Sequence, residues 1–557
     1  MHRNERMNLV VIGGVAAGAS FAARARRLSE SARITVIERG PDVSFANCGL
    51  PYHIGGEIPN RDALAVQTPE SLKALLNIEV RTLAEAVAID RSGKRVQVRD
   101  VRTGHTDWLD YDALMLAPGA APLCPDLPGI DDRRIFTLRN LQDMDRIAAA
   151  ARPGMRAVVI GAGFIGLEMT EQLQRKGLSV QLVELQPQVI PPLDAPMAAL
   201  LESELRRNGV ALHLGDGIAR FEACGGQLCC RLNSGKVLEA DLVVLSIGVA
   251  PDSTLARAAG LELGPRGHIV VDAFQRTSDP DIYAAGDAVE TRDRVFDART
   301  AVPMGGPANR QGRVAADRLF LGDKARPYPG SLGTGIVRAF GAVAGLTGWS
   351  EKRLRAAGIP HETVTVNDSH HASYYPGARP LTLKILWAPD DGRLLGAQVS
   401  GAEGVDKRLD VLATAIVGHM TVEDLCHLEL AYAPPFGAAK DIVNLAGFAA
   451  CNRRDGLVAH TTELPDDPAV QVVDVRGKPL AEAFPPPRES MNIPFPALRA
   501  NLGTLDRSRP VVTLCAFGKM SYFAARVLAQ NGFRVSSFSG GMKANIDPQS
   551  PSRLPDA

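Results

Sequence analysis

Two separate cysteines lie in stretches whose residue types suit sulfur chemistry. One is Cys48, in the run Ser44-Phe45-Ala46-Asn47-Cys48-Gly49-Leu50-Pro51-Tyr52, and the other is Cys515, the first residue of a Cys-x-x-Gly-x-x-Ser loop. A lone thiolate can attack a sulfur atom and carry the product as a mixed disulfide or a persulfide. We therefore expect both to react with sulfur, Cys48 with a depressed thiol pKa. The alternative is an inert, buried cysteine for Cys48 and a degenerate domain used only for docking for Cys515. We expect Cys515 to head an open loop.

The elements around Cys48 predict a nucleotide-binding unit. Residues 8–12 read as a strand, a helix runs to residue 28, and residues 34–38 form a second strand that ends in an acid. In such a βαβ unit, glycines let a pyrophosphate approach the helix N-terminus and the acid binds a ribose hydroxyl. The residues assigned to this site are Gly13, Gly14, Ala17, Gly18 and Glu38. The match is imperfect, because Val15 replaces the second glycine, and a strand–turn–helix without nucleotide is the alternative.

The same unit recurs with a complete fingerprint. A strand at 157–160 leads into Gly161-Ala162-Gly163-Phe164-Ile165-Gly166, and a strand at 180–184 ends in Glu184. Gly161, Gly163, Gly166 and Glu184 are the predicted contacts. Two sites predict two dinucleotides, one of them a flavin, since hydride transfer between two nicotinamides has little use. Glu184, with no Arg nearby, favours NADH, although NADPH is possible.

Two more segments fit a flavin domain that is interrupted by the nicotinamide domain. Residues 114–122 run from a strand into a turn with Ala117 and Gly119, and residues 282–286 form a strand followed by Asp287. Asp287 is placed to bind a ribityl chain, or to cap a helix.

The chain order predicts an α/β protein with two Rossmann-like (FAD and NAD) domains, an α+β domain that in such enzymes serves as a dimerisation domain, and a C-terminal α/β domain whose Cys515 loop resembles that of a rhodanese-like domain. We expect these boundaries: FAD domain 1–120, NAD domain 121–250, FAD domain 251–330, dimerisation domain 331–447, linker 448–465 and rhodanese-like domain 466–557. The last residues, from about 548, look disordered.

Composition excludes several other classes. Lys plus Arg and Asp plus Glu both number 62, so there is no broad charge for nucleic acid or anionic lipid. No apolar run approaches a membrane span, and the first strand begins too early to leave room for a signal peptide. Eight scattered cysteines make no disulfide framework, which indicates the cytoplasm. Cys224, Cys229 and Cys230 lack further metal ligands, so we expect thiols on a hairpin and no metal site.

With these residues in view, residues 8 to about 447 resemble the pyridine-nucleotide disulfide oxidoreductases and, within them, the coenzyme A-disulfide reductases. The signature is the run from Ser44 to Gly56. Residues from about 466 resemble a rhodanese domain. The fusion is similar to the coenzyme A-disulfide reductase–rhodanese enzymes, also described as NADH-dependent persulfide or polysulfide reductases. In the glutathione-reductase branch a second cysteine stands five residues after the first, where this chain has His53.

The resemblance implies a homodimeric FAD-dependent NAD(P)H reductase of persulfide, polysulfide or coenzyme A-disulfide substrates, whose rhodanese domain carries sulfane sulfur. An NADH oxidase or peroxidase that uses a cysteine sulfenic acid is the alternative, and a flavoprotein redox sensor is a third possibility.

The resemblance also assigns individual residues. Tyr432 of the Ala431–Phe436 stretch and Tyr374 are the implied active-site tyrosines, with Tyr375 as the competing choice. Further implied contacts are Pro303 and Phe436 for the cofactor, and Ser20, Arg24, Arg27, Ser44 and Asn47 for coenzyme A. Simple packing or a solvated helix face is the alternative for the tyrosines and the arginines. Since Ala516 and Met520 replace the arginines typical of sulfurtransferase loops, thiosulfate should be a poor substrate.

Overall fold

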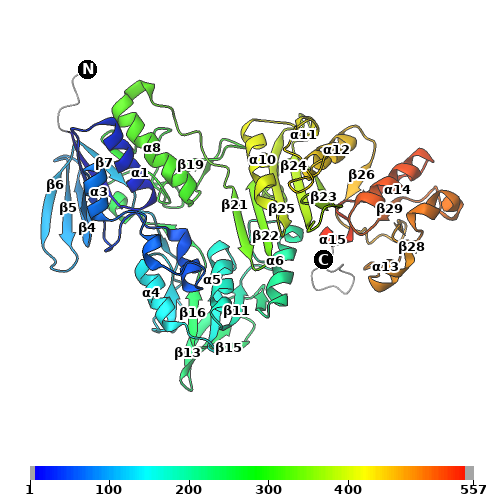
Figure 1. The fold of residues 1–557 in the computed structure, drawn as a ribbon, viewed down its shortest axis with the longest axis horizontal. Coiled ribbons are helices and arrows are strands. Elements are labelled where there is room, and N and C mark those ends of the chain that lie inside the picture. Colours follow the sequence, from blue (N-terminus) through cyan, green and yellow to red (C-terminus); the bar gives the residue numbers. More distant parts are fainter. Residues whose placement is uncertain (1–6, 546–557) are drawn as a thin grey trace. The chain divides into compact units, whose positions relative to one another are not determined.

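The computed structural model describes residues 7–545, which fall into two compact units (Figure 1). Unit 1 comprises Met1–Val183 and Gly217–Gly333, and unit 2 comprises Glu184–Asp216 and Thr334–Ala557. The C-terminal tail from residue 548, for which disorder was expected, lies outside the described residues. Between residues 7 and 545, no helix combines the length and the apolar character needed to cross a bilayer.

A parallel sheet of five strands organises the first part of unit 1, in the order β18-β7-β1-β2-β3. Its strands are β1 (Asn8–Ile12), β2 (Arg33–Ile37), β3 (Glu79–Arg81), β7 (Ala113–Leu116) and β18 (Ile282–Ala284). Apolar residues of β1, β2 and β7 are buried on both faces, as expected for a parallel sheet between other layers. The helices α1 (Ala16–Leu28) and α8 (Gly305–Leu321) pack against each other, and the backbone at Gly312 approaches the carbonyl of Ala17 too closely for any side chain.

An antiparallel sheet and several short elements complete this part. The sheet consists of β4 (Ala84–Asp90), β5 (Arg95–Asp100) and β6 (Thr106–Asp110). The short elements are η1 (Asn47–Gly49), α2 (Leu50–Ile54), η2 (Arg61–Leu64), α3 (Pro69–Leu76), α7 (Thr254–Ala258), and the pairs β8 (Ala120–Pro122) with β17 (Val249–Pro251) and β19 (Thr291–Arg292) with β20 (Arg299–Thr300).

A second parallel sheet follows in the chain. It contains β11 (Ser179–Glu184), β10 (Arg156–Ile160), β16 (Leu242–Leu245) and β9 (Ile135–Thr137), with the helices α4 (Leu141–Ala150) and α5 (Phe164–Arg175). The strands β13 (Ile218–Cys224), β14 (Gln227–Leu232) and β15 (Val237–Ala240) form an antiparallel sheet. The expected hairpin is present, but the expectation of free thiols is wrong for two of its cysteines, because Cys224 and Cys229 face each other across the hairpin and form a disulfide. Cys230 is free and buried.

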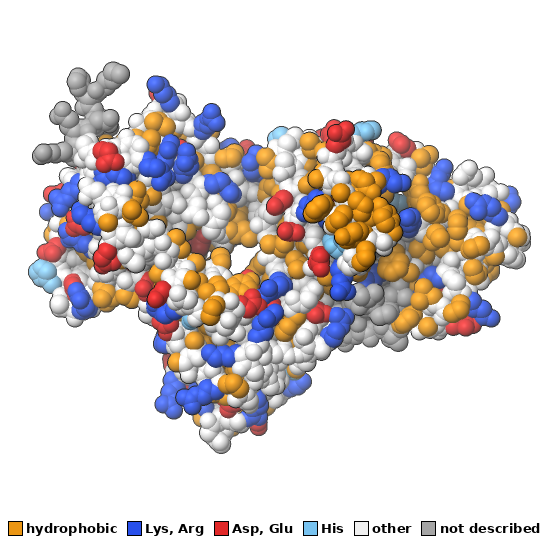
Figure 2. Space-filling view, viewed as in Figure 1, with side chains coloured by type: hydrophobic (Ala, Val, Ile, Leu, Met, Phe, Trp, Pro, Cys, Tyr) orange, Lys and Arg blue, Asp and Glu red, His pale blue; other side chains and the backbone are white. Residues whose placement is uncertain are grey.

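Unit 2 is built on an antiparallel sheet of five strands, in the order β21-β22-β25-β24-β23. They are β21 (Gly335–Ala339), β22 (Ala342–Gly348), β23 (Glu362–Ser369), β24 (Pro380–Trp387) and β25 (Leu394–Gly401). The helices of this part are α6 (Ala195–Arg207), α9 (Glu351–Ala356), α10 (Val405–Val417), α11 (Val422–Cys426) and α12 (Ile442–Arg454). This is the expected α+β arrangement, and Figure 2 shows hydrophobic side chains gathered on the visible face of this unit.

The last part of unit 2 holds a parallel sheet in the order β26-β30-β29-β27-β28. Its strands are β26 (Ala459–Thr461), β27 (Gln471–Asp474), β28 (Met491–Asn492), β29 (Val511–Leu514) and β30 (Val535–Phe538), and its helices are α13 (Lys478–Ala483), η4 (Phe495–Thr504), α14 (Lys519–Gln530) and α15 (Gly541–Asn545). The sheets and the order of their strands confirm the predicted α/β fold class.

The expectation of an irregular linker at 448–465 is wrong for most of that stretch. Its first residues belong to α12, and β26 pairs with β30 of the last sheet. Ala450 continues the buried face of the helix, and Val458 is buried just before the strand. Because the residues between Ala450 and Val458 are mostly polar, the short apolar pattern is not evident in the sequence, which therefore looks irregular.

Candidate functional site

The turn after β1 has the geometry that close approach of a phosphate requires. Gly13 has φ +92°, and a Cβ atom there would lie 2.1 Å from the carbonyl oxygen of Ala117. A Cβ at Gly18 would lie 1.9 Å from the carbonyl oxygen of Gly13, so α1 can begin this close to the turn only with glycine. Ala17 is buried in the same turn of α1. The structure therefore provides a glycine cradle at the N-terminus of α1, where an anion is favoured.

Glu38 lies beside this cradle, as predicted from its place after β2. Its carboxylate accepts hydrogen bonds from the backbone N–H of Gly14 (2.9 Å) and Gly40 (2.9 Å). The two bonds fix the carboxylate at the edge of the turn. A ribose hydroxyl would find an acceptor there.

Asp287 follows β18 on the same sheet. Burial raises the pKa of its carboxyl, while the positive charge of Arg139 acts in the opposite direction. Gly286 before it has φ +87°, and its N–H donates to Oε1 of Gln311 (2.8 Å) on α8. A half-buried carboxyl at the end of a parallel strand suits binding of a polar group of a cofactor.

The other predicted cofactor residues of this part lie in connecting segments. Ala117 and Gly119 follow β7, and Pro303 is exposed just before α8. The turn after β7 is bridged by Arg139, whose guanidinium donates to the carbonyl oxygen of Pro118 (3.0 Å).

Cys48 lies in the short helix η1, directly before α2. The thiol is exposed to solvent. Even so, protein atoms around the thiol shield it in part from water, and this partial burial is the largest cause that raises its pKa. The negative charges of Glu168 and Asp287 raise it further. Burial and these two carboxylates thus raise the thiol pKa of the protein without a bound flavin, whereas attack on sulfur at neutral pH needs a depressed pKa. Tyr52 of the same stretch donates to Glu168 (3.2 Å) and holds that carboxylate in place.

Arg139 and Glu168 are residues that the sequence did not single out. Burial lowers the pKa of Arg139, and the nearby Arg39 adds to the effect. The side-chain amide of Asn47 donates to the backbone carbonyl oxygen of Arg139 (3.3 Å). Because Asn47 directly precedes Cys48, this hydrogen bond links the segment of Arg139 to the segment of Cys48. Neither residue lies in a motif, so only the folded chain places them near Cys48 and Asp287.

The second glycine turn shows the same construction. Gly161 has φ +99°, a Cβ at Gly166 would lie 1.8 Å from the Gly161 carbonyl oxygen, and Gly163 has open space around it. The helix α5 starts after Gly163 with no side-chain cap. Glu184 ends β11, and one of its oxygens accepts from the N–H of Gln186 (2.8 Å). The open position at Gly163 leaves the helix N-terminus accessible to a phosphate.

The residues implied for coenzyme A have different environments. Ser20 donates to Asn309 (2.8 Å). Arg24 is engaged by an ion pair with Asp317 (2.6 Å), whereas Arg27 is exposed on the same helix. Ser44 adopts φ +48° and its N–H donates to the carbonyl oxygen of Gly14 (2.9 Å), while Asn47 is exposed beside Cys48.

In unit 2 the structure brings the two predicted tyrosines together. The hydroxyls of Tyr374 and Tyr432 lie 3.2 Å apart, and this hydrogen bond raises the pKa of Tyr374. Tyr374 is 74% exposed, Tyr432 49% and Phe436 70%, so this aromatic group faces solvent. Tyr375, the competing choice, packs edge-on against His371 instead.

Tyr432 and Phe436 lie in the segment between α11 and α12, residues 427–441, which we call the Tyr432 loop. Lys407 donates to the carbonyl oxygens of Ala431 (3.3 Å) and Phe436 (3.2 Å). Arg408, only 2% exposed, pairs with Asp441 (2.6 Å) at the end of the loop and donates to the carbonyl oxygen of His370 (2.7 Å) before Tyr374. Two adjacent cations of α10 therefore position both tyrosine segments, a role that the sequence did not reveal.

Cys515 ends β29 and begins the turn into α14. Its side chain is only 4% exposed, and the N–H of Gly518 donates to its sulfur (3.2 Å). Ser521 lies near the same sulfur (3.6 Å). The expectation of an open loop is wrong for the thiol itself, although Phe517 and Met520 on the rim are exposed.

The loop of Cys515 is fixed by a residue of the preceding domain. Asn367 of β23 donates its amide hydrogens to the carbonyl oxygens of Phe517 (3.0 Å) and Gly540 (2.9 Å), and accepts from Thr382 (2.7 Å). The N–H of Thr365 on the same strand donates to Ser539 (3.0 Å). Both loops that frame Cys515 are thus held by β23.

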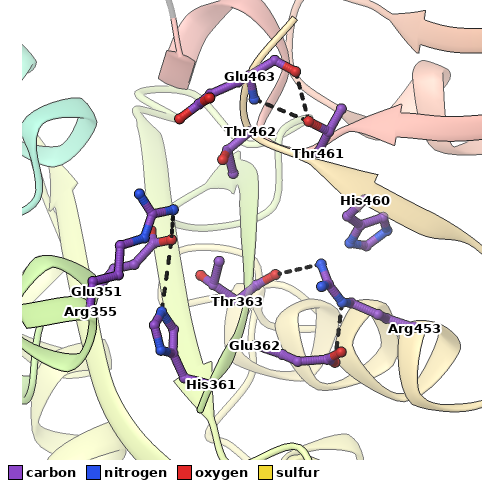
Figure 3. A pocket seen from close by; sticks show the side chains of 10 residues that line it. All are labelled: Glu351, Arg355, His361, Glu362, Thr363, Arg453, His460, Thr461, Thr462 and Glu463. Atoms are coloured by element: carbon purple, nitrogen blue, oxygen red, sulfur yellow. Dashed lines mark hydrogen bonds and ion pairs between the residues drawn. The ribbon is translucent and has the colours of Figure 1, made fainter. Parts of the chain in front are cut away.

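Figure 3 shows a cavity of about 430 Å³ within unit 2 that involves none of the predicted site residues. Arg453 crosses its floor to pair with Glu362 (3.1 Å). Burial, with a contribution from Arg453, lowers the pKa of His460 to about 4, so this imidazole is neutral at ordinary pH. The cavity belongs to the packing of β26 against α12 and β23, and nothing in it marks a reaction centre.

Comparisons with known proteins agree with this geometry. Residues 7–305 match the family described as pyridine nucleotide-disulphide oxidoreductase, residues 340–441 its dimerisation domain and residues 459–546 a rhodanese-like domain. A coenzyme A disulfide reductase of Staphylococcus aureus (strain JH9) is 33% identical over 444 residues, which are 79% of this chain and 99% of that protein.

Two solved structures resemble nearly the whole chain. Reduced Bacillus anthracis CoADR-RHD is 43% identical, with 98% of each chain covered and a TM-score of 0.94. An NAD-dependent persulfide reductase from A. fulgidus is 38% identical, with 97% of this chain and 100% of that one covered and a TM-score of 0.91. These matches confirm the family resemblance drawn from the sequence: the chain belongs to the pyridine nucleotide-disulphide oxidoreductase family.

Proposed function

We propose that this enzyme is an FAD-dependent NADH reductase of persulfide, polysulfide or coenzyme A-disulfide substrates. The observation that carries the proposal is the pairing, in one chain, of a lone exposed thiol at Cys48 with a buried, N–H-bonded thiol at Cys515. A reducing compartment such as the cytoplasm suits two free thiols.

The two glycine turns supply sites that fit the two cofactors. The cradle at Gly13 and Gly18, with Glu38 and Asp287, would hold FAD, because the backbone turns there with no room for a Cβ atom and presents the N-terminus of α1 to a pyrophosphate. The turn at Gly161–Gly166, with Glu184, would hold NADH. When bound, the flavin accepts a hydride from the nicotinamide and supplies an electron pair to a disulfide or persulfide.

Cys48 supplies the nucleophile. Its thiolate attacks the outer sulfur of a persulfide R–S–SH, a new S–S bond forms at Cys48, and the R–S⁻ leaving group departs. Two electrons and the necessary protons then break that bond, release hydrogen sulfide and restore the thiol. The raised pKa keeps Cys48 protonated at rest, so a positive field is needed to form the thiolate during turnover.

Cys515 would carry sulfane sulfur for this reaction. The N–H of Gly518 and the N-terminus of α14 stabilise a negatively charged sulfur at this position. Burial protects the carried sulfur from water, and the apolar rim of Phe517 and Met520 disfavours a small dianion such as thiosulfate.

The exposed pair Tyr374–Tyr432 would complete the site of a second subunit in a homodimer. Exposed aromatic groups of this kind mark interaction surfaces, and an isologous dimer builds two sites at once. Mixing Cys48→Ser with Tyr432→Phe subunits tests this: heterodimers should regain one intact site, and no gain in activity over the parent variants would contradict a shared site.

Coenzyme A would bind beside Cys48 through Ser20, Ser44, Asn47 and Arg27. Arg24 contributes less than the sequence suggested, because its charge is already paired with Asp317.

The direct test measures NADH-dependent sulfide release from coenzyme A persulfide, inorganic polysulfide and coenzyme A disulfide, with hydrogen peroxide as the comparison substrate. We expect kcat/KM for a sulfur substrate to exceed that for peroxide, and NADH to be preferred over NADPH. Faster turnover of peroxide than of every sulfur substrate would instead identify an NADH peroxidase, and equal rates with both nucleotides would refute the role of Glu184.

A further inference from the structure

Two cysteines that the proposed reaction does not use lie in contact at the base of the Tyr432 loop. Cys426 is the last residue of α11, where the loop begins, and Cys451 lies in α12, which follows the loop. Their sulfur atoms are 3.4 Å apart. A disulfide bond measures about 2.0 Å, so closing it needs a movement of only about 1.4 Å.

The packing of the two helices holds this pair in place. A Cβ atom at Gly447, one turn before Cys451, would lie 2.9 Å from the backbone nitrogen of Cys426, so the two backbones are already in close contact. Arg454 pairs with Glu423 (2.8 Å) and joins the same two helices. Rotation of the two cysteine side chains is therefore enough to bring the sulfur atoms together, with the helices left in place.

We propose that Cys426 and Cys451 form a reversible modification site, a dithiol that sulfane-sulfur compounds oxidise to a disulfide across the base of the Tyr432 loop. This proposal rests on the proposed function in one respect: the oxidants are persulfides and polysulfides, which would be the enzyme's substrates. The disulfide itself forms without NADH or turnover.

The oxidation balances in two exchange steps. The Cys426 thiolate attacks the sulfane sulfur of R–S–SH, which forms a Cys426 persulfide and expels R–S⁻. The Cys451 thiolate then attacks the Sγ atom of Cys426, the Cys426–Cys451 bond forms, and hydrosulfide leaves. In total, two thiols lose two electrons and two protons, and one persulfide becomes one thiol and one hydrogen sulfide.

The contact between the thiols sets their order of reaction. Burial raises the pKa of both, that of Cys451 to about 12, and the hydrogen bond between them raises the pKa of Cys451 while it lowers that of Cys426. Cys426 is thus the first to ionise, with the Cys451 S–H as donor.

The disulfide would restrict the segment that carries Tyr432 and Phe436. It would close a covalent loop from Cys426 to Cys451, 25 residues apart in the chain. Cross-linking the ends of a segment removes open conformations of that segment. The modification would therefore limit the motion of the tyrosine that the proposed reaction needs at its site.

The test treats full-length holoenzyme with sodium tetrasulfide in the absence of NADH, alkylates the remaining thiols and maps the peptides by mass spectrometry. We expect Cys426 and Cys451 to disappear from the alkylated pool and to reappear as one disulfide-linked peptide pair, which dithiothreitol releases. Cys451→Ser should lose the linked pair, and Cys124→Ser, which alters an exposed free thiol elsewhere, should retain it. Full alkylation of both cysteines after treatment, or separate persulfides on each, would overturn the proposal.

A second measurement tests the effect on the loop. Amide hydrogen exchange in residues 427–441 should be several-fold slower in the oxidised wild-type protein than in the reduced one, and unchanged by oxidation in Cys426→Ser. Equal exchange in both forms of the wild type would refute control of the loop. Sulfide release with NADH is measured separately, so a failure of the proposed function leaves both results interpretable.

Discussion

The two candidate thiols occupy opposite environments. Cys48 is exposed, and the carboxylates of Glu168 and Asp287 help to raise its pKa. Cys515 is buried, and the N–H of Gly518 donates to its sulfur. One site leaves the sulfur open to attack and disfavours its anion, whereas the other encloses the sulfur and places an N–H donor on it.

This difference indicates a division of labour. A thiol that must react with changing substrates needs access, while a thiol that stores sulfur needs protection from water and from other thiols. The dimerisation part of the chain adds to the protection, because Asn367 holds both loops that frame Cys515.

Loss of Cys48 should have the largest effect. In Cys48→Ser, NADH-dependent sulfide release should fall by at least about 1,000-fold, because the hydroxyl that replaces the thiol cannot form the S–S bond. Bound flavin, measured by absorbance, should be unchanged. Cys124→Ser, another exposed free cysteine in unit 1, is the matched control and should keep full activity. Residual sulfide release near the wild-type rate would show that the open thiol is not the reactive one.

Loss of Cys515 should separate the two roles. Cys515→Ser should spare the reduction of a small persulfide that reaches Cys48 directly. Turnover of sulfane sulfur that must first be carried by Cys515 should fall by about 100-fold. The loss is smaller than in Cys48→Ser because some of this sulfur still reaches Cys48 without Cys515. If every sulfur substrate is reduced at the wild-type rate, the domain of Cys515 serves as a scaffold only.

The comparison of the two sites also shows which features the sequence can predict. Both thiols, the two glycine turns and Glu38 lie in local motifs, and a motif specifies its own backbone, so these features were accessible. The environment of each thiol was not, because Glu168 and Arg139 reach Cys48 and Asp287 only through the tertiary fold. For the same reason the sequence suggested an open loop at Cys515, which in fact packs under Gly540 and Gly541.

The same limit applies to the end of the dimerisation part. Strand β26 has only three residues and no apolar periodicity, so its pairing with β30 could not be foreseen.

Removal of the Asn367 side chain should have a smaller effect than loss of Cys515 itself. Asn367→Ala deletes two hydrogen bonds to the loops around Cys515, worth about 1 kcal/mol each, so transfer through Cys515 should slow by at most about 30-fold. The buried thiol should also become easier to alkylate. Thr382→Val, which removes only the donor to Asn367, is the graded control and should show a weaker effect in the same direction. Unchanged alkylation of Cys515 in both variants would show that β23 does not hold the loop.

The smallest expected effect concerns the charge beside Cys48. Glu168→Gln removes one of the negative charges that raise the pKa of the thiol, so the thiolate becomes less unfavourable and the pKa falls. At any pH below that pKa a larger fraction of Cys48 is then ionised, and alkylation by iodoacetamide should be a few-fold faster than in the wild type. The complete curve of rate against pH should move to lower pH, while the plateau at high pH stays the same, because the thiolate itself is unaltered. Glu57→Gln, which changes a carboxylate that pairs with Arg175 and is not among the leading causes of the raised pKa, should leave the curve in place. A curve for Glu168→Gln that coincides with the wild type would show that Glu168 does not raise the pKa, and the electrostatic contrast between Cys48 and Cys515 would then rest on Asp287 and on the N–H donor at Cys515.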